Sequence, residues 1–170
     1  SENGNTIGCG VECNNNILAG LSMLRKYEIY ALDNNGNNFN HSELYSYIKS
    51  NRNTGLAGEA LRIDMEKRLW QGNDNAKQAF HLQLAHNYTK LHQGKAQSDA
   101  QGVLEFIRLL NISQRLYNQI DLSKASTVEK NQLGLGAFST KNLSRPDLIY
   151  VLSSKIMGYD LKDIFQFYGL

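Results

Sequence analysis

Proline is nearly absent from this sequence: the 170 residues include one, Pro146. This scarcity excludes proline-rich linkers, and it leaves long stretches in which a helix can run without interruption. Glycine falls largely between the apolar stretches, where helices commonly end. Both features favour a mostly helical chain.

Cysteine is scarce as well: Cys9 and Cys13 are the only two. Their spacing does not fit a thioredoxin-like CxxC motif, and the second pair that would complete a zinc site is missing. Gly10 permits a tight turn between them. The two thiols either close a small disulfide loop in an exported chain or stay reduced, and the sequence leaves both alternatives open.

Long apolar runs and a strong excess of one charge are also missing. No run approaches the ~18–20 apolar residues of a membrane span. The 18 basic and 16 acidic side chains leave a net charge of +2, which is too small to indicate a nucleic acid or a membrane surface as partner. We therefore expect no nucleic-acid partner and no membrane span.

The two ends of the sequence lack the features of a complete chain. The start, Ser1–Asn5, is polar, without an initiator Met or the apolar stretch of a signal peptide. The end at Leu170 is abrupt. We expect a segment excised from a larger protein.

The sequence does contain apolar residues at helical spacing. In the first such stripe, Ile17, Leu21 and Leu24 recur at every third or fourth position. The best strand-like alternation, Tyr27–Leu32, continues the same stripe. Signals for helix starts recur at Asn14–Asn16, Asn40, Thr54, Asp74, Ser98, Ser126, Ser144 and Asp160.

This pattern predicts an all-α fold, a single domain of about seven or eight helices in an irregular bundle. The domain is expected to span residues 14–170, after a disordered or loop segment at 1–13. The helix that begins after Ser144 carries apolar residues on most of its sides, so we expect it to be central and buried. Gly158 is expected to end that helix in a left-handed conformation.

The four histidines do not form a recognisable metal motif. His81 and His86 are five residues apart, about 140° around a helix, so they do not share a face as zinc ligands at i and i+4 do. His92 is no better placed, His41 stands alone, and no HExxH occurs. We expect these histidines to be surface or partly packed residues.

A calcium loop is the other candidate metal site. Asp33, Asn35 and Asn37 match the first three ligand positions of an EF-hand, but Asn38 replaces its glycine, and Glu43 falls one residue before the expected acidic position. The segment Asp33–Glu43 is therefore either a weak calcium-binding loop or an asparagine-rich connection between two helices.

Nothing in the sequence marks a catalytic residue. No GxSxG occurs, and Gly134-Leu135-Gly136 lacks the third glycine and the preceding strand of a nucleotide-binding fingerprint. Trp70, with Lys67 and Arg68 beside it, allows a carbohydrate or nucleic-acid platform. A single tryptophan at the end of an amphipathic helix is more often a core residue, and we expect Trp70 in the core.

The last two expected helices carry a family resemblance. The segment Asp147–Leu170 resembles the closing helices of gluzincin-type metallopeptidases, above all the secreted, enhancin-like, mucin-directed enzymes and the related bacterial accessory colonisation lipoproteins. The family pattern is a buried helix with a serine, a glycine turn, Asp/Asn-Leu opening the next helix, Phe, and then Trp-Gly. The matching residues are Ser154, Gly158, Asp160, Leu161, Phe165 and Gly169. Tyr168 replaces the usual tryptophan.

The resemblance implies a function through a larger protein. The chain would be the non-catalytic helical region after the zinc-binding core of a secreted or cell-surface metallopeptidase, where it supports the cleft and substrate binding. Zinc would be held by the parent protein, because the HExxH and its distal glutamate are absent here. Its partners would be the rest of the parent chain and a host glycoprotein or mucin. The competing hypothesis is a stand-alone protein-interaction module, with or without calcium at Asp33–Glu43.

Overall fold

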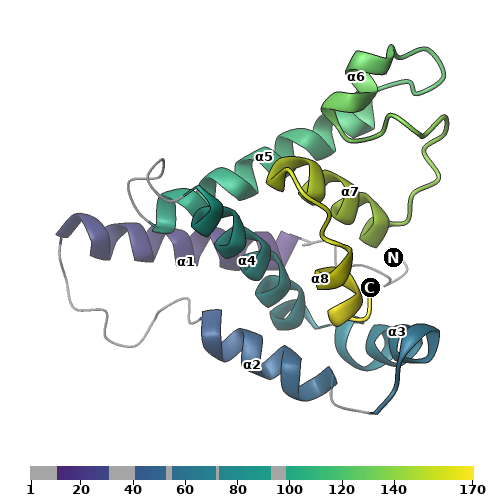
Figure 1. Cartoon of the computed structure of the whole chain (residues 1–170). Coiled ribbons are helices and arrows are strands. Elements are labelled where there is room, and N and C mark those ends of the chain that lie inside the picture. Colours follow the sequence, from purple (N-terminus) through teal and green to yellow (C-terminus); the bar gives the residue numbers. More distant parts are fainter. Residues whose placement is uncertain (1–10, 31–40, 53–54, 72, 93–98) are drawn as a thin grey trace.

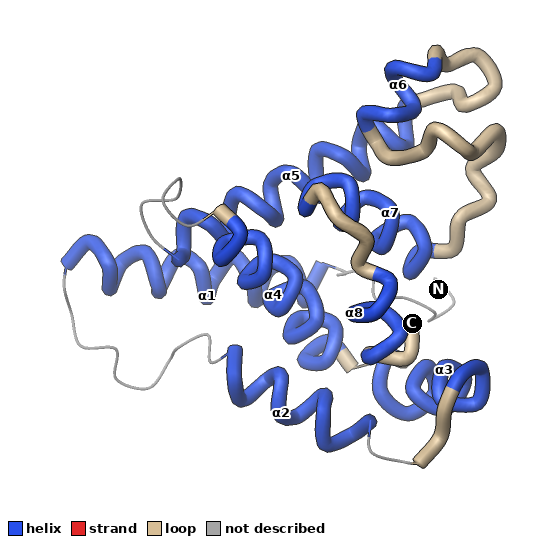
Figure 2. Tube along the Cα trace, viewed as in Figure 1, coloured by secondary structure: helices blue, strands red, loops and turns tan. Residues whose placement is uncertain are grey.

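The computed structural model describes residues 11–30, 41–52, 55–71, 73–92 and 99–170, and every regular element in these ranges is a helix (Figure 2). The described ranges contain α1 (Val11–Tyr30), α2 (His41–Arg52), α3 (Gly58–Met65), the π-helical turn η1 (Glu66–Trp70), α4 (Asp74–Leu91), α5 (Asp99–Gln119), α6 (Thr127–Gln132), α7 (Arg145–Met157) and α8 (Lys162–Phe167). The predicted all-α fold of seven or eight helices is confirmed.

The first helix begins earlier than the sequence indicates. α1 starts at Val11, so residues 11–13 are helical and do not belong to the loop expected at 1–13. Residues 1–10 lie outside the described ranges. The strand-like alternation at Tyr27–Leu32 is helical as far as Tyr30, as its helical stripe indicates.

Side-chain caps fix several helix starts. In α6, Ser126 Oγ accepts the amide of Glu129 at 3.3 Å, and the Glu129 carboxylate accepts the amide of Ser126 at 2.8 Å. Ser144 caps α7 by accepting the amide of Asp147 at 3.2 Å, and Gly158 ends α7 at φ +80°. These three expectations are confirmed, and each cap satisfies main-chain groups that a helix end leaves unpaired.

Two expected caps are shifted by one residue. Asn73 caps α4 in place of Asp74, because its side chain accepts the amide of Ala76 at 3.0 Å. Asp160 lies one residue before the N-cap of α8, Leu161, and its carboxylate accepts the amide of Lys162 at 2.9 Å. The expected caps at Asn40, Thr54 and Ser98 lie outside the described residues.

α4 is the central helix, not the helix after Ser144. It contacts α1, α2, α5, α7 and η1, and it crosses the middle of the molecule (Figure 1). Its buried residues are Ala76, Ala79, Phe80, His81, Leu82, Leu84, Ala85 and Thr89. The three small alanines let its neighbours approach closely. α7 contacts α5 and α4, and its apolar residues Leu148, Val151 and Ile156 remain half-buried.

Helices α4 and α5 approach each other closely at Thr89 and Gly102. A β-carbon added at Gly102 would lie 2.5 Å from both Cγ2 and Oγ1 of Thr89. The Thr89 hydroxyl itself is satisfied, since it donates to the Ala85 carbonyl at 2.9 Å. Only glycine therefore permits this separation of the helices without a shift.

The chain end packs onto the turn η1. In this wider turn the amide of Gln71 donates to the carbonyl of Glu66, five residues back. Both Leu69 and Trp70 are thereby buried. Trp70 is 2% exposed and meets the ring of Phe80 edge-on at 5.8 Å. The expectation that Trp70 is a core residue is confirmed, which rules out its use as an exposed platform.

Within the described ranges, no helix has the length and apolar character needed to cross a membrane. This finding agrees with the expectation of no membrane span.

Candidate functional site

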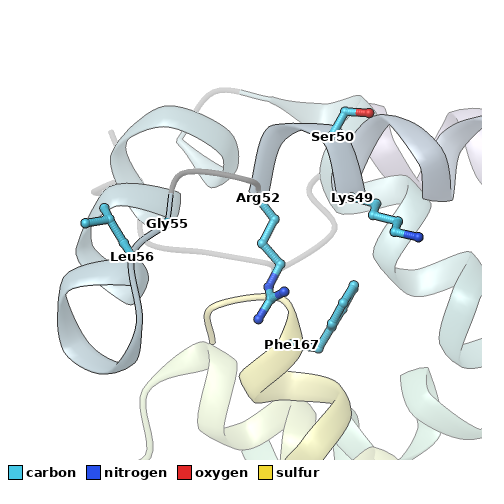
Figure 3. Close-up of a pocket in the computed structure, with 6 residues that line it drawn as sticks. All are labelled: Lys49, Ser50, Arg52, Gly55, Leu56 and Phe167. Atoms are coloured by element: carbon cyan, nitrogen blue, oxygen red, sulfur yellow. The ribbon is translucent and has the colours of Figure 1, made fainter.

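A hollow of about 720 Å³ lies beside the end of α2 and is the candidate functional site (Figure 3). Its described lining comes from the end of α2, the residues that follow it, and the last residue of α8, which is distant from the others in sequence. The lining residues are Lys49, Ser50, Arg52, Gly55, Leu56 and Phe167. This set holds two cationic side chains and no carboxylate.

Arg52 is the side chain with the most unusual environment in this hollow. Its guanidinium carbon lies 4.4 Å from the centroid of the Phe167 ring, so the cation stacks on the aromatic face. The residue is half-buried, and its Nε atom is buried without a hydrogen-bond partner. A buried donor of a charged group normally has a partner.

The ring of Phe167 lies between two side chains of α2. Its ring stacks with that of Tyr45 at 6.3 Å and an interplanar angle of 16°, and with the guanidinium of Arg52. Tyr45 and Arg52 are two helical turns apart, about 10.5 Å along the axis, which leaves room for one ring between them. The packing of α8 against α2 therefore fixes the plane on which Arg52 rests.

One acidic residue of α3, Asp64, is already paired with an arginine of η1. Asp64 accepts from Arg68 at 3.1 Å. Arg68 also donates to the main-chain carbonyl of Asn51, and at 3.3 Å to its side-chain oxygen. Arg68 thus links the end of α2 to α3 and η1. No carboxylate among the residues that line the hollow pairs with Arg52.

The histidines considered as metal ligands are not brought together. His81 is buried in the core, and its Nδ1 donates to the Lys77 carbonyl at 2.8 Å. Burial lowers the pKa of this imidazole from 6.5, and the smaller effect of the Lys77 hydrogen bond opposes that change. His92 Nδ1 donates to the Tyr88 carbonyl at 2.8 Å. Among the described residues, no group of three or more His, Cys, Asp or Glu side chains could hold a metal ion.

Two of the sequence-based sites fall outside what the structure describes. Residues 31–40, which carry most of the possible calcium loop Asp33–Glu43, are not described, and neither is Cys9 of the possible disulfide. Both remain predictions.

The sequence analysis missed Arg52 and Phe167. The only available signal was a basic residue in the last turn of α2, which is common because it interacts favourably with the helix dipole. The contact with Phe167 depends on how α8 packs, and no local pattern encodes it.

Comparison with known proteins places the chain in no family. No family model matches it, and no curated protein or solved structure matches it either.

Proposed function

We propose that this chain is the non-catalytic helical region that follows the zinc-binding core of a secreted, mucin-directed metallopeptidase of the gluzincin type, or of a related accessory colonisation lipoprotein. In that role it packs against the core, supports one wall of the cleft and contributes to binding of a glycoprotein substrate. The rest of the parent chain is its first partner.

The observation that carries this proposal is that the residues shared with the family pattern interlock α7 and α8. Ser154 Oγ accepts the amide of Leu161 at 3.2 Å, across the turn made by Gly158. Leu161 and Phe165 are buried. A family pattern made of packing residues requires such contacts, so they support the proposal.

The last two residues of the family pattern, Tyr168 and Gly169, also have defined positions in the core. Gly169 adopts φ +69° next to Met65, where a β-carbon would lie 2.9 Å from the sulfur. Tyr168, at the position of the family tryptophan, buries its ring against Phe80 at 5.1 Å. A large aromatic residue followed by glycine is what this corner of the core accommodates.

The described residues of this chain do not fit a zinc site, because no three or more of their His, Cys, Asp or Glu side chains lie together as metal ligands. Under the proposal, the metal-binding residues belong to the parent protein, and no catalytic step is assigned to this chain.

The gene region upstream of the Ser1 codon tests the proposal. An HExxH motif with a downstream glutamate in the same reading frame is the expected result. An open reading frame without any metal motif would contradict it. The isolated chain, assayed on casein and mucin with added zinc, is expected to hydrolyse neither; turnover abolished by His81→Gln or His86→Gln would refute a non-catalytic role.

The stand-alone interaction module remains the second candidate function, and an exposed apolar groove favours it. The groove, of about 630 Å³, runs between α1 and α5. Leu18 is 49%, Ile29 59% and Leu104 48% exposed along it, and contiguous exposed apolar surface is typical of interaction sites. A gene that encodes a signal peptide before this domain and no metal motif would favour this candidate.

A further inference from the structure

The contact that the Arg52 guanidinium makes differs in kind from those of Arg62 and Arg108. Arg62 pairs with Glu59 at 2.6 Å, and Arg108 pairs with Glu105 at 2.9 Å. Arg52 makes its contact with a ring, and its Nε–H is removed from water without an acceptor. Leaving a buried donor of a charged group unpaired is costly, and no carboxylate lines the hollow to offset the charge of the guanidinium.

The orientation of the guanidinium is fixed before any ligand arrives. The guanidinium carbon lies over the Phe167 ring, and Figure 3 shows the side chain extending from the end of α2 to that ring. A planar guanidinium presents parallel N–H donors that match the oxygens of carboxylate and phosphate. Stacking leaves the edge of the group for such contacts, and less rotamer entropy is lost when they form.

The charge of the hollow selects for an anion. Lys49 and Arg52 line it without any carboxylate among the lining residues. In Figure 3 the Lys49 side chain points away from Arg52, so Lys49 adds to the positive potential while Arg52 supplies the direct contact. The dipole of α2 also favours a cation at this end, but that effect acts on charge alone and does not account for a desolvated, unpaired Nε–H.

We propose that the hollow at the end of α2 binds an oxyanionic group, a phosphate, sulfate or carboxylate, with the guanidinium of Arg52 stacked on Phe167 as its principal contact. The site consists of this chain's own residues, so it would bind its anion whether or not the chain belongs to a peptidase.

NMR titration of the ¹⁵N-labelled chain tests this proposal. Phosphate, sulfate and acetate are added in separate titrations at constant ionic strength, and the Arg52 Nε–H signal, assigned with Arg52→Lys, is followed. We expect a saturable shift of that signal and of the amides of Gly55 and Leu56. Arg52→Gln is expected to weaken the affinity about tenfold or more, because a charge-assisted hydrogen bond is lost.

Two further variants separate a specific site from general charge and from unfolding. Arg108→Gln removes an equal charge from α5 and should leave the affinity unchanged. Phe167→Leu keeps Arg52 but removes the aromatic face, and it should weaken binding while far-UV circular dichroism shows the helices intact. If Arg52→Gln does not fold, the comparison rests on Phe167→Leu and Arg108→Gln.

The outcomes decide both the existence of the site and its ligand. A saturable response to acetate alone identifies a carboxylate site, whereas a response to phosphate and sulfate alone identifies a site for tetrahedral anions. The absence of a saturable shift with all three anions would overturn the proposal. Equal weakening by Arg108→Gln and Arg52→Gln would overturn it too, because binding would then depend only on net charge.

Discussion

The indole N–H of Trp70 donates a hydrogen bond of 3.2 Å to the main-chain carbonyl of Tyr168. Both residues are buried, and their rings also meet edge-on at 6.4 Å. The bond joins the end of the turn η1 to the residue that follows α8, so the last helix is attached to the core through its main chain as well as its side chains.

The first prediction concerns the aromatic contacts of α8. Phe165 is 4% exposed and lies 5.1 Å from Phe80. Phe165→Ala is expected to lower the free energy of unfolding by about 3–5 kcal/mol. Gly158→Ala should cost about 1 kcal/mol, because φ is positive there, and the exposed Lys162→Ala less than about 0.5 kcal/mol. Urea denaturation gives the order; a loss below about 1 kcal/mol for Phe165→Ala would show that α8 is not packed as described.

The second prediction compares two glycines that both have a positive φ. Gly158 and Gly169 have φ of +80° and +69°, but only Gly169 has a close neighbour, with Met65 Sδ 2.9 Å from the position of an added β-carbon. Gly169→Ala should therefore cost about 1–3 kcal/mol more than Gly158→Ala, since overpacking adds to the backbone strain. Equal losses in urea denaturation would mean that Met65 moves aside freely.

The third prediction reverses the usual effect of alanine in a helix. Replacing a glycine inside a helix with alanine normally stabilises it by roughly 0.5–1 kcal/mol. Gly102→Ala should instead destabilise the protein by about 1–3 kcal/mol, because the new methyl group overlaps Thr89. The double variant with Thr89→Ala removes the two closest atoms and should recover part of that loss. Calorimetric unfolding midpoints of the single and double variants provide the measurement.

The fourth prediction concerns the pH dependence of stability. Burial lowers the pKa of His81 from 6.5 in the folded chain, so the unfolded chain takes up a proton first as the pH falls. The free energy of unfolding should be fully retained above 6.5. Below that pH it should decrease, by at most about 1.4 kcal/mol per pH unit, until the folded-state pKa is reached.

His81→Leu removes this titrating ring and should flatten the pH dependence between about pH 7 and about pH 5. His92→Gln is the matched control, because it removes an imidazole that makes the same kind of bond to a carbonyl four residues back but lies half-buried at the end of α4. Urea denaturation across this pH range distinguishes them. An unchanged slope in His81→Leu would show that His81 is not the group responsible.

The fifth prediction is that folding does not require a metal. The described core consists of apolar contacts among the helices, with Phe80, Phe106 and Leu135 among its fully buried side chains. Far-UV circular dichroism should therefore be the same before and after EDTA. Loss of helix on chelation would contradict the prediction.

Adding calcium back tests the loop Asp33–Glu43 directly. A rise of the unfolding midpoint with calcium, but not with magnesium, would identify the loop as a calcium site.

Local features of the fold were predictable, because their causes lie within a few residues. The caps at Ser126 and Ser144 and the left-handed Gly158 follow from side-chain and backbone preferences at single positions. The central position of α4 was not predictable in this way. It depends on alanines, which give no signal of burial in a local sequence pattern. Arg52 and Phe167 were not predicted as site residues for the same reason. A single arginine and a single phenylalanine do not indicate a site in the sequence, and they meet only because α8 packs against α2.

The bond between Trp70 and Tyr168 closes a loop of 98 residues. The entropy lost in such a closure grows only slowly with length, roughly as 1.5 RT ln n, but it is lost before the aromatic contacts can offset it. Helices such as α4 and α5 depend on neighbours in sequence and can form without this closure. The single tryptophan therefore lies where two segments that are far apart in the sequence meet. Its fluorescence reports the formation of that contact and not the formation of any one helix.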